Sequence, residues 1–289
     1  MFNVHISKSC VDDVNFKSEF DNILKSIPSD HISIESDREH MIIRVDGSLF
    51  ARCRTFENNE CEIQQGNVVA RKLDIAMGGE LATIPAFVLQ STKQPEHLIW
   101  KYVSKGSVLV TRYRNNASHL YHRRNKKGLK LKNALQQKTR IRWLRKWLIT
   151  LLVLDNDDHK QNVWDDGVRL DLDHAWQALS SESCSTFDDF QGCDTVSTEQ
   201  IQLAKLLTDT TTKGDIVLLR YWLAKIPEKI IRESCLNSNF LRTEDELLER
   251  ITAKTCKVAR LIKKCLDLEG ATPISILKYI IKKWDENHP

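Results

Sequence analysis

Residues 151–176 read LLVLDNDDHKQNVWDDGVRLDLDHAW, a stretch in which seven aspartates lie among apolar residues. Apolar side chains recur at spacings of three and four residues up to its start, which predicts a long helix with one buried face: Leu144, Trp147, Leu148, Leu151 and Leu152. This helix leads into a polar loop at 155–162. A hairpin that turns at 165–167 (Asp-Asp-Gly) then returns the chain as an apolar strand that carries Asp171 and Asp173.

Three side chains of this stretch have the spacing that phosphoryl transfer from ATP requires. In protein kinases a catalytic-loop aspartate accepts or orients the proton of the acceptor hydroxyl, and an asparagine five residues later binds Mg²⁺. A further metal-binding aspartate follows on the next strand. Here Asp157 and Asn162 are five residues apart, and Asp173 follows eleven residues after Asn162. The hairpin is expected to bring Asp173 back beside Asn162.

The acidic loop has two simpler interpretations. Asp and Asn are common in solvated turns because their side chains bond to nearby backbone, and an acidic loop can also bind calcium. The EF-hand pattern is absent, since no helix–loop–helix frames the loop and no glutamate closes it. The buried helix before the loop and the second acidic cluster on an apolar strand disfavour a purely solvated turn.

The motif D-D-H-x-x-N at 157–162, followed by L-D-H at 172–174, resembles the catalytic and metal-binding motifs of the HipA-like kinases. These kinases share a two-lobed fold with the phosphatidylinositol 3- and 4-kinases, whose motif is similar. The resemblance implies an ATP- and Mg²⁺-dependent serine/threonine protein kinase. It further implies that Asp157 is the catalytic base, Asn162 a metal ligand and Asp173 the principal Mg²⁺ ligand.

The same resemblance implies roles for several further residues. His159 is expected to hold the catalytic loop by bonding to neighbouring backbone. Asp171 shares a strand face with Asp173, so it is either a second metal ligand or a solvent-facing residue. A strand at 107–113 (SVLVTRY) is similar to the family's strand that leads into the adenine-binding hinge, which implies hinge positions for the last three residues of that strand: Thr111, Arg112 and Tyr113.

The order of predicted elements indicates an α+β, two-lobed, protein-kinase-like fold. A helix at 16–26 precedes an antiparallel meander whose second turn is Asp46-Gly47, with strands at 31–35, 41–45 and 48–54. A helix at 64–77 follows, and then strands at 84–90 and 107–113. Later helices are predicted from 139 and at 198–208, 215–226, 229–235, 243–268 and 274–284. We expect a small β-rich nucleotide-binding lobe at 1–114, a helical catalytic lobe at 115–289, and a ligand held in the cleft between them.

The small lobe departs from the kinase pattern in two ways. Kinases hold nucleotide phosphates with a strand lysine paired to a glutamate, whereas the strand 48–54 offers Arg52 and Arg54 for the phosphates, with Glu60 or Glu62 as the acidic partner. The alternative for these arginines is an exposed strand edge that bears basic residues. The connection between the first two strands also lacks glycine. A weak kinase or a pseudokinase is therefore an open alternative.

Charge is distributed unevenly along the chain. Residues 97–154 carry fifteen Lys or Arg and no Asp or Glu, which leaves 28 of the 43 basic residues against 39 acidic ones elsewhere. Such a region attracts an anionic partner, whether nucleotide phosphates, an acidic protein substrate, a phosphoinositide membrane or RNA. A basic face that only aids solubility is the simpler interpretation. A lipid kinase and an RNA-associated module are thus alternatives to a kinase that phosphorylates proteins, including itself.

Two observations bear on these alternatives and on location. Trp143 and Trp147 fall on the apolar side of the predicted helix, which favours the core over stacking on nucleic acid. No apolar run reaches the ~20 residues of a membrane helix, and the N-terminal sequence lacks a secretory signal pattern. The eight cysteines are scattered without a CxxC pair, which is typical of reduced thiols. These features predict a cytoplasmic protein, with export by a dedicated secretion system left open.

Overall fold

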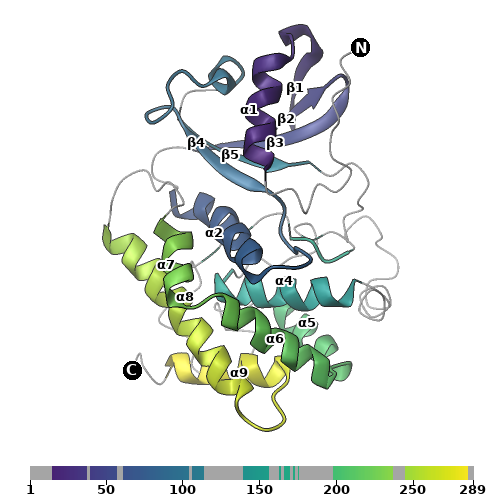
Figure 1. Cartoon of the computed structure of the whole chain (residues 1–289), viewed down its shortest axis with the longest axis vertical. Helices are drawn as coiled ribbons and strands as arrows, with labels where there is room; N and C mark the ends of the chain where they lie inside the picture. Colours follow the sequence, from purple (N-terminus) through teal and green to yellow (C-terminus); the bar gives the residue numbers. More distant parts are fainter. Residues whose placement is uncertain are drawn as a thin grey trace.

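The computed structural model describes residues 15–37, 40–56, 61–103, 106–113, 139–155, 163, 166–169, 172, 175, 198–236 and 245–285. They form two lobes that follow one another along the long axis of the molecule, a smaller one built on a β-sheet and a larger one built of helices (Figure 1). Each lobe has its own hydrophobic core. The predicted α+β class, with a small antiparallel lobe and a larger helical lobe, is confirmed.

The small lobe contains a five-stranded antiparallel sheet. Its strands, in spatial order, are β1 (Ile32–Asp37), β2 (His40–Val45), β3 (Ser48–Phe56), β5 (Ser107–Arg112) and β4 (Ala86–Gln90). Asp46 and Gly47 join β2 to β3, and both have the positive φ (49° and 76°) that a type I′ hairpin turn requires. The predicted meander is confirmed, and β3 is an interior strand rather than an exposed edge.

One face of the sheet is covered by α1 (Phe16–Ser26), which lies across it in Figure 1. Phe16 and Phe20 of this helix pack against Phe50 and Phe87 with ring centroids 5.4 and 5.9 Å apart. Two short 3₁₀ helices also belong to this lobe: Ser29–His31 lies between α1 and β1, and Leu98–Lys101 lies between β4 and β5. The four phenylalanine rings pack together in the core of the small lobe.

The helix α2 (Cys61–Met77) contributes to both lobes. Its Val68 packs against Val88 and Leu109 on the second face of the sheet. Four residues further along α2 belong to the core of the helical lobe: Val69, Ala70, Leu73 and Met77. The predicted helix at 64–77 is confirmed and begins three residues earlier. The predicted lobe boundary at 114/115 lies outside the described residues and stays a prediction.

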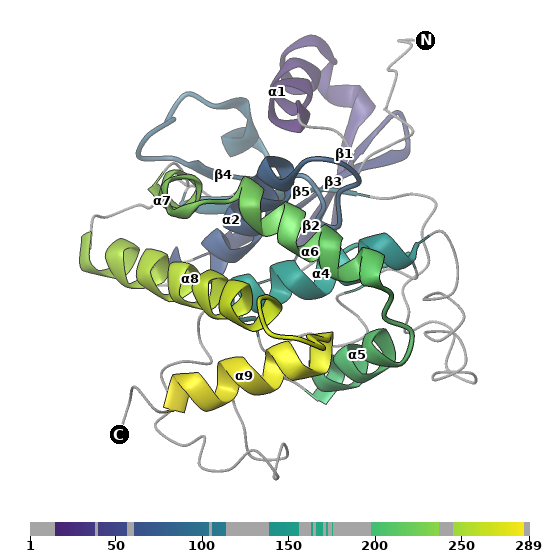
Figure 2. The ribbon, with the colours of Figure 1, turned by 60° about the horizontal axis from the view of Figure 1, so that its bottom comes forward.

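The helical lobe adds six helices within the described ranges. They are α4 (Arg140–Leu152), α5 (Thr198–Asp209), α6 (Lys213–Lys225), α7 (Glu228–Leu236), α8 (Asp245–Leu266) and α9 (Pro273–Asp285). The helix α4 packs against α2, α5, α6 and α8, so it is enclosed on several sides (Figure 2). Trp143 and Trp147 are 2% and 1% exposed, as predicted for core residues. Within the described ranges, no helix is both long and apolar enough to cross a membrane.

Candidate functional site

The five residues predicted to form the catalytic loop and metal site all lie outside the described residues: Asp157, His159, Asn162, Asp171 and Asp173. Their immediate neighbours in the chain are described. Asp155 precedes Asp157 by two residues, Val163 follows Asn162, and Leu172 precedes Asp173. The contacts of these neighbours are what the structure shows of the predicted motif's surroundings in the chain.

The loop begins at a buried carboxylate. The helix α4 ends at Leu152, Leu154 adopts a left-handed conformation (φ 51°), and Asp155 follows with no exposed surface. The carboxylate of Asp155 forms an ion pair with Arg169, and both side chains are at most 1% exposed. The Gln200 side chain of α5 donates a hydrogen bond to the backbone oxygen of Asp155. A buried charge is tolerated when it is paired and hydrogen-bonded, so this arrangement fixes where the loop leaves α4.

The loop returns through the predicted hairpin. Val163 and Arg169 form an isolated antiparallel bridge, and Gly167 in the turn has a φ of 87°. A Cβ at Gly167 would lie 3.0 Å from the Trp143 ring, so glycine allows the turn to lie directly on α4. Arg142 of α4 also donates to Asp166 at 2.6 Å. The hairpin is therefore held against α4 by both packing and charge.

Arg169 connects the hairpin to the segment between α2 and β4. Its backbone N–H donates to the Ala82 oxygen at 2.7 Å, and its oxygen accepts from the Ile84 N–H at 3.3 Å. These bonds form a parallel bridge to Thr83. The chain that enters the small lobe after α2 is thereby joined to the chain that carries the predicted metal-binding residues.

The end of the motif lies against α2. A Cβ at Gly66 would be 2.1 Å from the Leu172 oxygen and 2.7 Å from the Ala175 Cβ. The backbone at Leu172 therefore lies closer to α2 than any side chain at position 66 would allow. Leu172 and Ala175, which stand on either side of Asp173 in the sequence, therefore both lie against α2. The described residues next to the motif thus lie where α2, α4 and the segment before β4 meet.

A second buried ion pair reinforces this junction. One carboxylate oxygen of Asp74 in α2 accepts from the backbone N–H groups of Ala82 and Thr83, each at 2.8 Å, and from the Thr83 hydroxyl at 2.6 Å. The other oxygen accepts from the Arg145 Nε of α4. Arg71 donates to the Thr83 oxygen at 2.6 Å. Asp74 thus ties α2 to α4 and to the segment before β4.

The predicted phosphate-binding arginines lie on the side of the sheet that α2 covers. Arg52 is opposite Thr111 in the register of β3 and β5, and Arg54 is opposite Leu109. Residues opposite one another project to the same face of a sheet, and Leu109 packs against Val68 of α2. Both arginines are partly exposed. Their side-chain direction is compatible with a role at the lobe junction.

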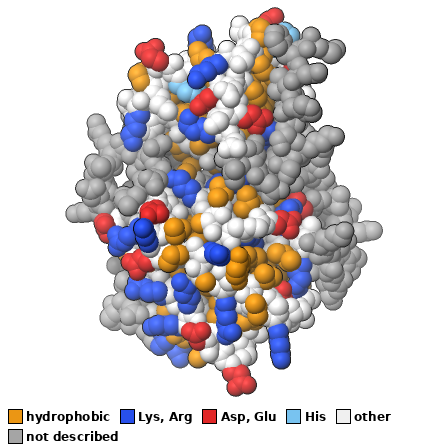
Figure 3. Space-filling view, in the orientation of Figure 1, with side chains coloured by type: hydrophobic (Ala, Val, Ile, Leu, Met, Phe, Trp, Pro, Cys, Tyr) orange, Lys and Arg blue, Asp and Glu red, His pale blue; other side chains and the backbone are white. Residues whose placement is uncertain are grey.

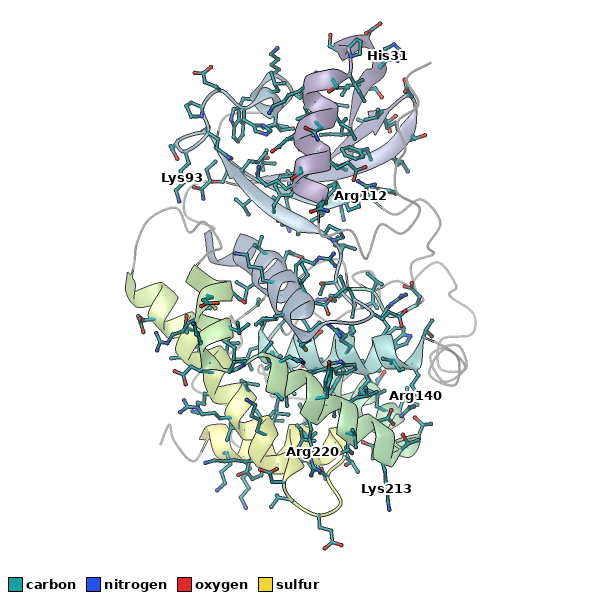
Figure 4. The ribbon with its side chains drawn as sticks, in the orientation of Figure 1. His31, Lys93, Arg112, Arg140, Lys213 and Arg220 are labelled. Atoms are coloured by element: carbon teal, nitrogen blue, oxygen red, sulfur yellow. The ribbon has the colours of Figure 1, made fainter. Side chains whose placement is uncertain are left out.

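The three predicted hinge residues differ in direction. Arg112 points under α1, where its guanidinium lies 5.2 and 5.0 Å from the Phe16 and Phe50 rings and donates to Glu19 at 2.6 Å (Figure 4). Thr111 projects to the opposite face and donates to the Arg52 oxygen at 3.3 Å. The N–H of Tyr113 donates to the Phe50 oxygen at 3.1 Å. The contacts of Arg112 are those of a core residue in the small lobe.

The described part of the basic region is largely neutralised by acidic partners. Arg140, labelled in Figure 4, forms an ion pair with Asp215 at 2.7 Å. The guanidinium of Arg142 contacts Glu80 as well as Asp166, and Arg145 is paired with Asp74. Residues 114–138 lie outside the described ranges, so the predicted anionic partner of the 97–154 region stays a prediction.

The carboxylate and amide side chains of the motif are the oxygen ligands that Mg²⁺ prefers. Elsewhere in the described residues, no group of three His, Cys, Asp or Glu side chains is placed to hold a metal. The buried pairs Asp155–Arg169 and Asp74–Arg145 were not found from the sequence. These pairs can be recognised only in the folded structure, where they lie between the two lobes. No pattern in the sequence indicates which charged residues will pair.

Comparison with known proteins gives limited information. No protein-family model matches the chain, and no curated protein does so. Among solved structures, a Helicobacter pylori proinflammatory kinase, CtkA, is similar over 86% of this chain and 96% of that chain, with 12% identity and a TM-score of 0.48. The activity of this chain therefore has to be argued from its own residues.

Proposed function

We propose that the chain is an ATP- and Mg²⁺-dependent phosphotransferase, most specifically a HipA-like serine/threonine protein kinase. One observation carries the proposal: a kinase-spaced set of two aspartates and an asparagine whose flanking residues are fixed at the junction of the two lobes. Asp155 before the loop is paired with Arg169 after it, and Gly66 of α2 contacts Leu172 and Ala175, the described neighbours of Asp173 in the sequence. A solvated surface turn does not need a buried ion pair between the residues on its two sides.

The proposed roles follow the chemistry of the three side chains. Bound Mg²⁺ neutralises the triphosphate and the charge that develops during transfer. Asn162 and Asp173 provide oxygen ligands for it, with Asp171 as a further candidate ligand. Asp157 accepts the proton of the acceptor hydroxyl as the hydroxyl oxygen bonds to the γ-phosphorus and the bond to ADP breaks. His159 holds the loop in shape.

The small lobe supplies the proposed phosphate contacts. In protein kinases a basic residue on the third strand reaches the nucleotide phosphates and pairs with an acidic residue of the following helix. Here β3 is followed by α2, and Arg52 and Arg54 project to the side that α2 covers. Arginine keeps the charge of the usual lysine but places it in a planar fork. We therefore expect weaker nucleotide binding than with lysine, and a pseudokinase is the alternative if transfer fails.

Two other activities are distinguished by the acceptor. A lipid kinase would use the same three residues on phosphoinositides. An RNA-associated module would need accessible aromatic rings and basic groups, whereas Trp143 and Trp147 are buried and the described arginines of α4 are paired with carboxylates. These contacts favour transfer to a protein or lipid hydroxyl over RNA binding.

The test is phosphate transfer from γ-labelled ATP to the protein itself, to a mixed protein substrate and to phosphatidylinositol vesicles. Asp157→Asn should lower turnover at least ~100-fold while retaining nucleotide binding, because it removes the base and keeps the side-chain shape. Asp173→Asn should abolish Mg²⁺-dependent nucleotide binding. Asp209→Asn, on an exposed part of α5, is the matched control and should retain wild-type turnover.

The result can also contradict the proposal. Equal turnover in the Asp157, Asp173 and Asp209 variants would show that the acidic loop is not the site of chemistry. Mg²⁺-dependent ATP binding without transfer to any acceptor would identify a pseudokinase. Transfer confined to the vesicles would replace the protein kinase by the lipid kinase.

A further inference from the structure

A group of basic residues lies on the helical lobe, outside the 97–154 region. Residues 251–283 contain eight Lys or Arg and two acidic residues. The two acids, Asp267 and Glu269, both lie in the turn between α8 and α9. The basic residues are distributed along the helices themselves: Lys254, Lys257, Arg260, Lys263, Lys264, Lys278, Lys282 and Lys283.

The basic residues of α8 occupy its outward side. Lys257, Arg260 and Lys264 are spaced at i, i+3 and i+7, which places them in one row along the helix. The opposite side of α8 is buried in the core of the lobe through residues such as Ile251 and Ile262. Arg260 and Lys264 are exposed, and Lys257 is partly exposed. The row therefore faces solvent.

The neighbouring helix α9 carries exposed basic residues as well. It packs against α8, and its exposed Lys278 and Lys282 are four residues apart, hence on one side of the helix. Figure 3 shows Lys and Arg side chains gathered over this part of the helical lobe. We call the outward sides of α8 and α9, defined by Lys257, Arg260, Lys264, Lys278 and Lys282, the α8–α9 face.

Part of the positive charge of the α8–α9 face has no acidic partner within the described ranges. Among the described residues, Arg260, Lys264 and Lys282 take part in no ion pair, in contrast to the arginines of α4. Burial lowers the pKa of Lys257, and the like charge of Arg260 lowers it further. Basic residues in the last turn of a helix also complement its dipole. That explains Lys263 and Lys264 but not Lys257, which lies more than two turns before the end of α8.

We propose that the α8–α9 face binds an anionic lipid surface. Clusters of four to eight basic residues on an amphipathic helix are typical of binding to acidic phospholipids. The apolar sides of both helices are already buried in the lobe, so binding would be electrostatic adsorption without insertion. The exposed basic residues are spread over two helices that pack together, which suits an extended charged plane better than a peptide.

Nucleic acid fits this face less well. Proteins that bind single strands combine basic groups with accessible aromatic rings on which bases stack. The aromatic residue described on α9, Tyr279, is only partly exposed and packs against the core of the lobe. The inference does not depend on the proposed phosphotransferase activity, since its test measures binding alone.

The test is co-sedimentation of the full chain with phosphatidylcholine vesicles, with and without phosphatidylserine or a phosphatidylinositol phosphate. The wild type should sediment with anionic vesicles only, and added salt should release it. The triple variant Lys257→Gln/Arg260→Gln/Lys264→Gln should bind roughly 100-fold more weakly at low salt, from the usual contribution of three basic groups near a charged bilayer. The matched control, Lys205→Gln/Lys213→Gln/Lys229→Gln, removes three exposed lysines from α5, α6 and α7 and should bind like the wild type.

Three outcomes would overturn the inference. The first is equal sedimentation with neutral and anionic vesicles. The second is an equal loss in the two triple variants, which would indicate a net-charge effect. The third is binding of an RNA oligonucleotide that the α8–α9 variant loses while neither protein binds vesicles. Circular dichroism should show the same helix content in all proteins, since every replaced side chain has its end in solvent or at the surface.

Discussion

Lys72 carries its amine into the interface between α2 and α7. Its Nζ is shielded from solvent and has no hydrogen-bond partner among the described residues. Burial lowers the pKa of Lys72 to about 8, although the neighbouring Cys235 of α7 acts in the opposite direction. The side chain of a lysine in an unfolded chain has a pKa of about 10.4. Between these two values, the unfolded chain therefore binds more protons at this residue than the folded chain does.

Replacing Lys72 should therefore change stability in a pH-dependent way. Since the unfolded state holds the extra proton, Lys72 makes the free energy of unfolding rise with pH between about 8 and 10. Lys72→Met should be more stable than the wild type at pH 7, and this advantage should shrink as the pH rises through that window. Urea unfolding at several pH values measures it. Lys229→Met, at a side chain that is 84% exposed, controls for loss of a lysine, and a constant difference at all pH values would contradict the prediction.

Single residues differ in how well the sequence predicts them. The Asp46-Gly47 turn and the buried Trp143 follow from local chemistry and helical spacing, and both are confirmed. The pairing of Arg145 with Asp74 does not follow, because 71 residues separate the partners and charged side chains are normally exposed. The sequence shows Arg145 only as one charge in a basic segment, and the fold converts it into an internal contact.

At the scale of elements, α2 is the helix that contacts the described neighbours of the candidate site. Glycine inside a helix normally costs up to about 1 kcal/mol relative to alanine, so Gly66 requires an explanation. The Leu172 oxygen supplies it, because an alanine Cβ at position 66 would lie 2.1 Å from that atom. Leu172 lies this close to α2 because residue 66 has no side chain.

Gly66→Ala should therefore destabilise the protein despite the higher helix propensity of alanine. The added methyl group meets backbone rather than a movable side-chain end, so the 172–175 segment must shift and phosphate transfer should fall at least tenfold. Gly214→Ala in α6 is the matched control: its Cβ would meet only Thr212 Oγ1 at 3.4 Å, and the change should be neutral or stabilising by up to about 1 kcal/mol. Thermal unfolding and transfer assays on both variants measure the contrast. A stabilised, fully active Gly66→Ala protein would show that the 172–175 segment is free to move away from α2.

Elements were predicted well where their side chains have a regular period and less well where the backbone bonds across lobes. The helices at 16–26 and 139–152 have clear apolar faces, and the structure agrees within one residue. The strand expected at 84–90 begins at Ala86, because Ile84 bonds to Arg169 instead of to β5. No pattern of apolar residues distinguishes these two hydrogen-bonding partners.

At the scale of the whole molecule, charge along the chain and charge on the surface are different quantities. The strongest basic run in the sequence, 97–154, supplies arginines that neutralise acidic residues of other segments. The α8–α9 face is harder to identify from the sequence, because acidic residues at 245–249 precede it in the same helix. The row of basic residues on the outward side of α8 can be identified only when the buried side of this helix is known.

Arg169 is the residue at which the parts of the molecule meet, since it joins the loop after α4, the hairpin and the segment that enters β4. Arg169→Met should lower the free energy of unfolding by about 3–5 kcal/mol, because it leaves the buried Asp155 carboxylate without its guanidinium. The double variant Arg169→Met/Asp155→Leu should recover part of that loss, since neither charge then remains buried. Arg232→Met, which removes exposed pairs with Glu228 and Glu249, should cost at most about 1 kcal/mol. Urea unfolding of the four proteins measures these differences. If the single Arg169 variant lost no more stability than the Arg232 variant, the two lobes would have to be held together mainly by α2 and the Asp74–Arg145 pair.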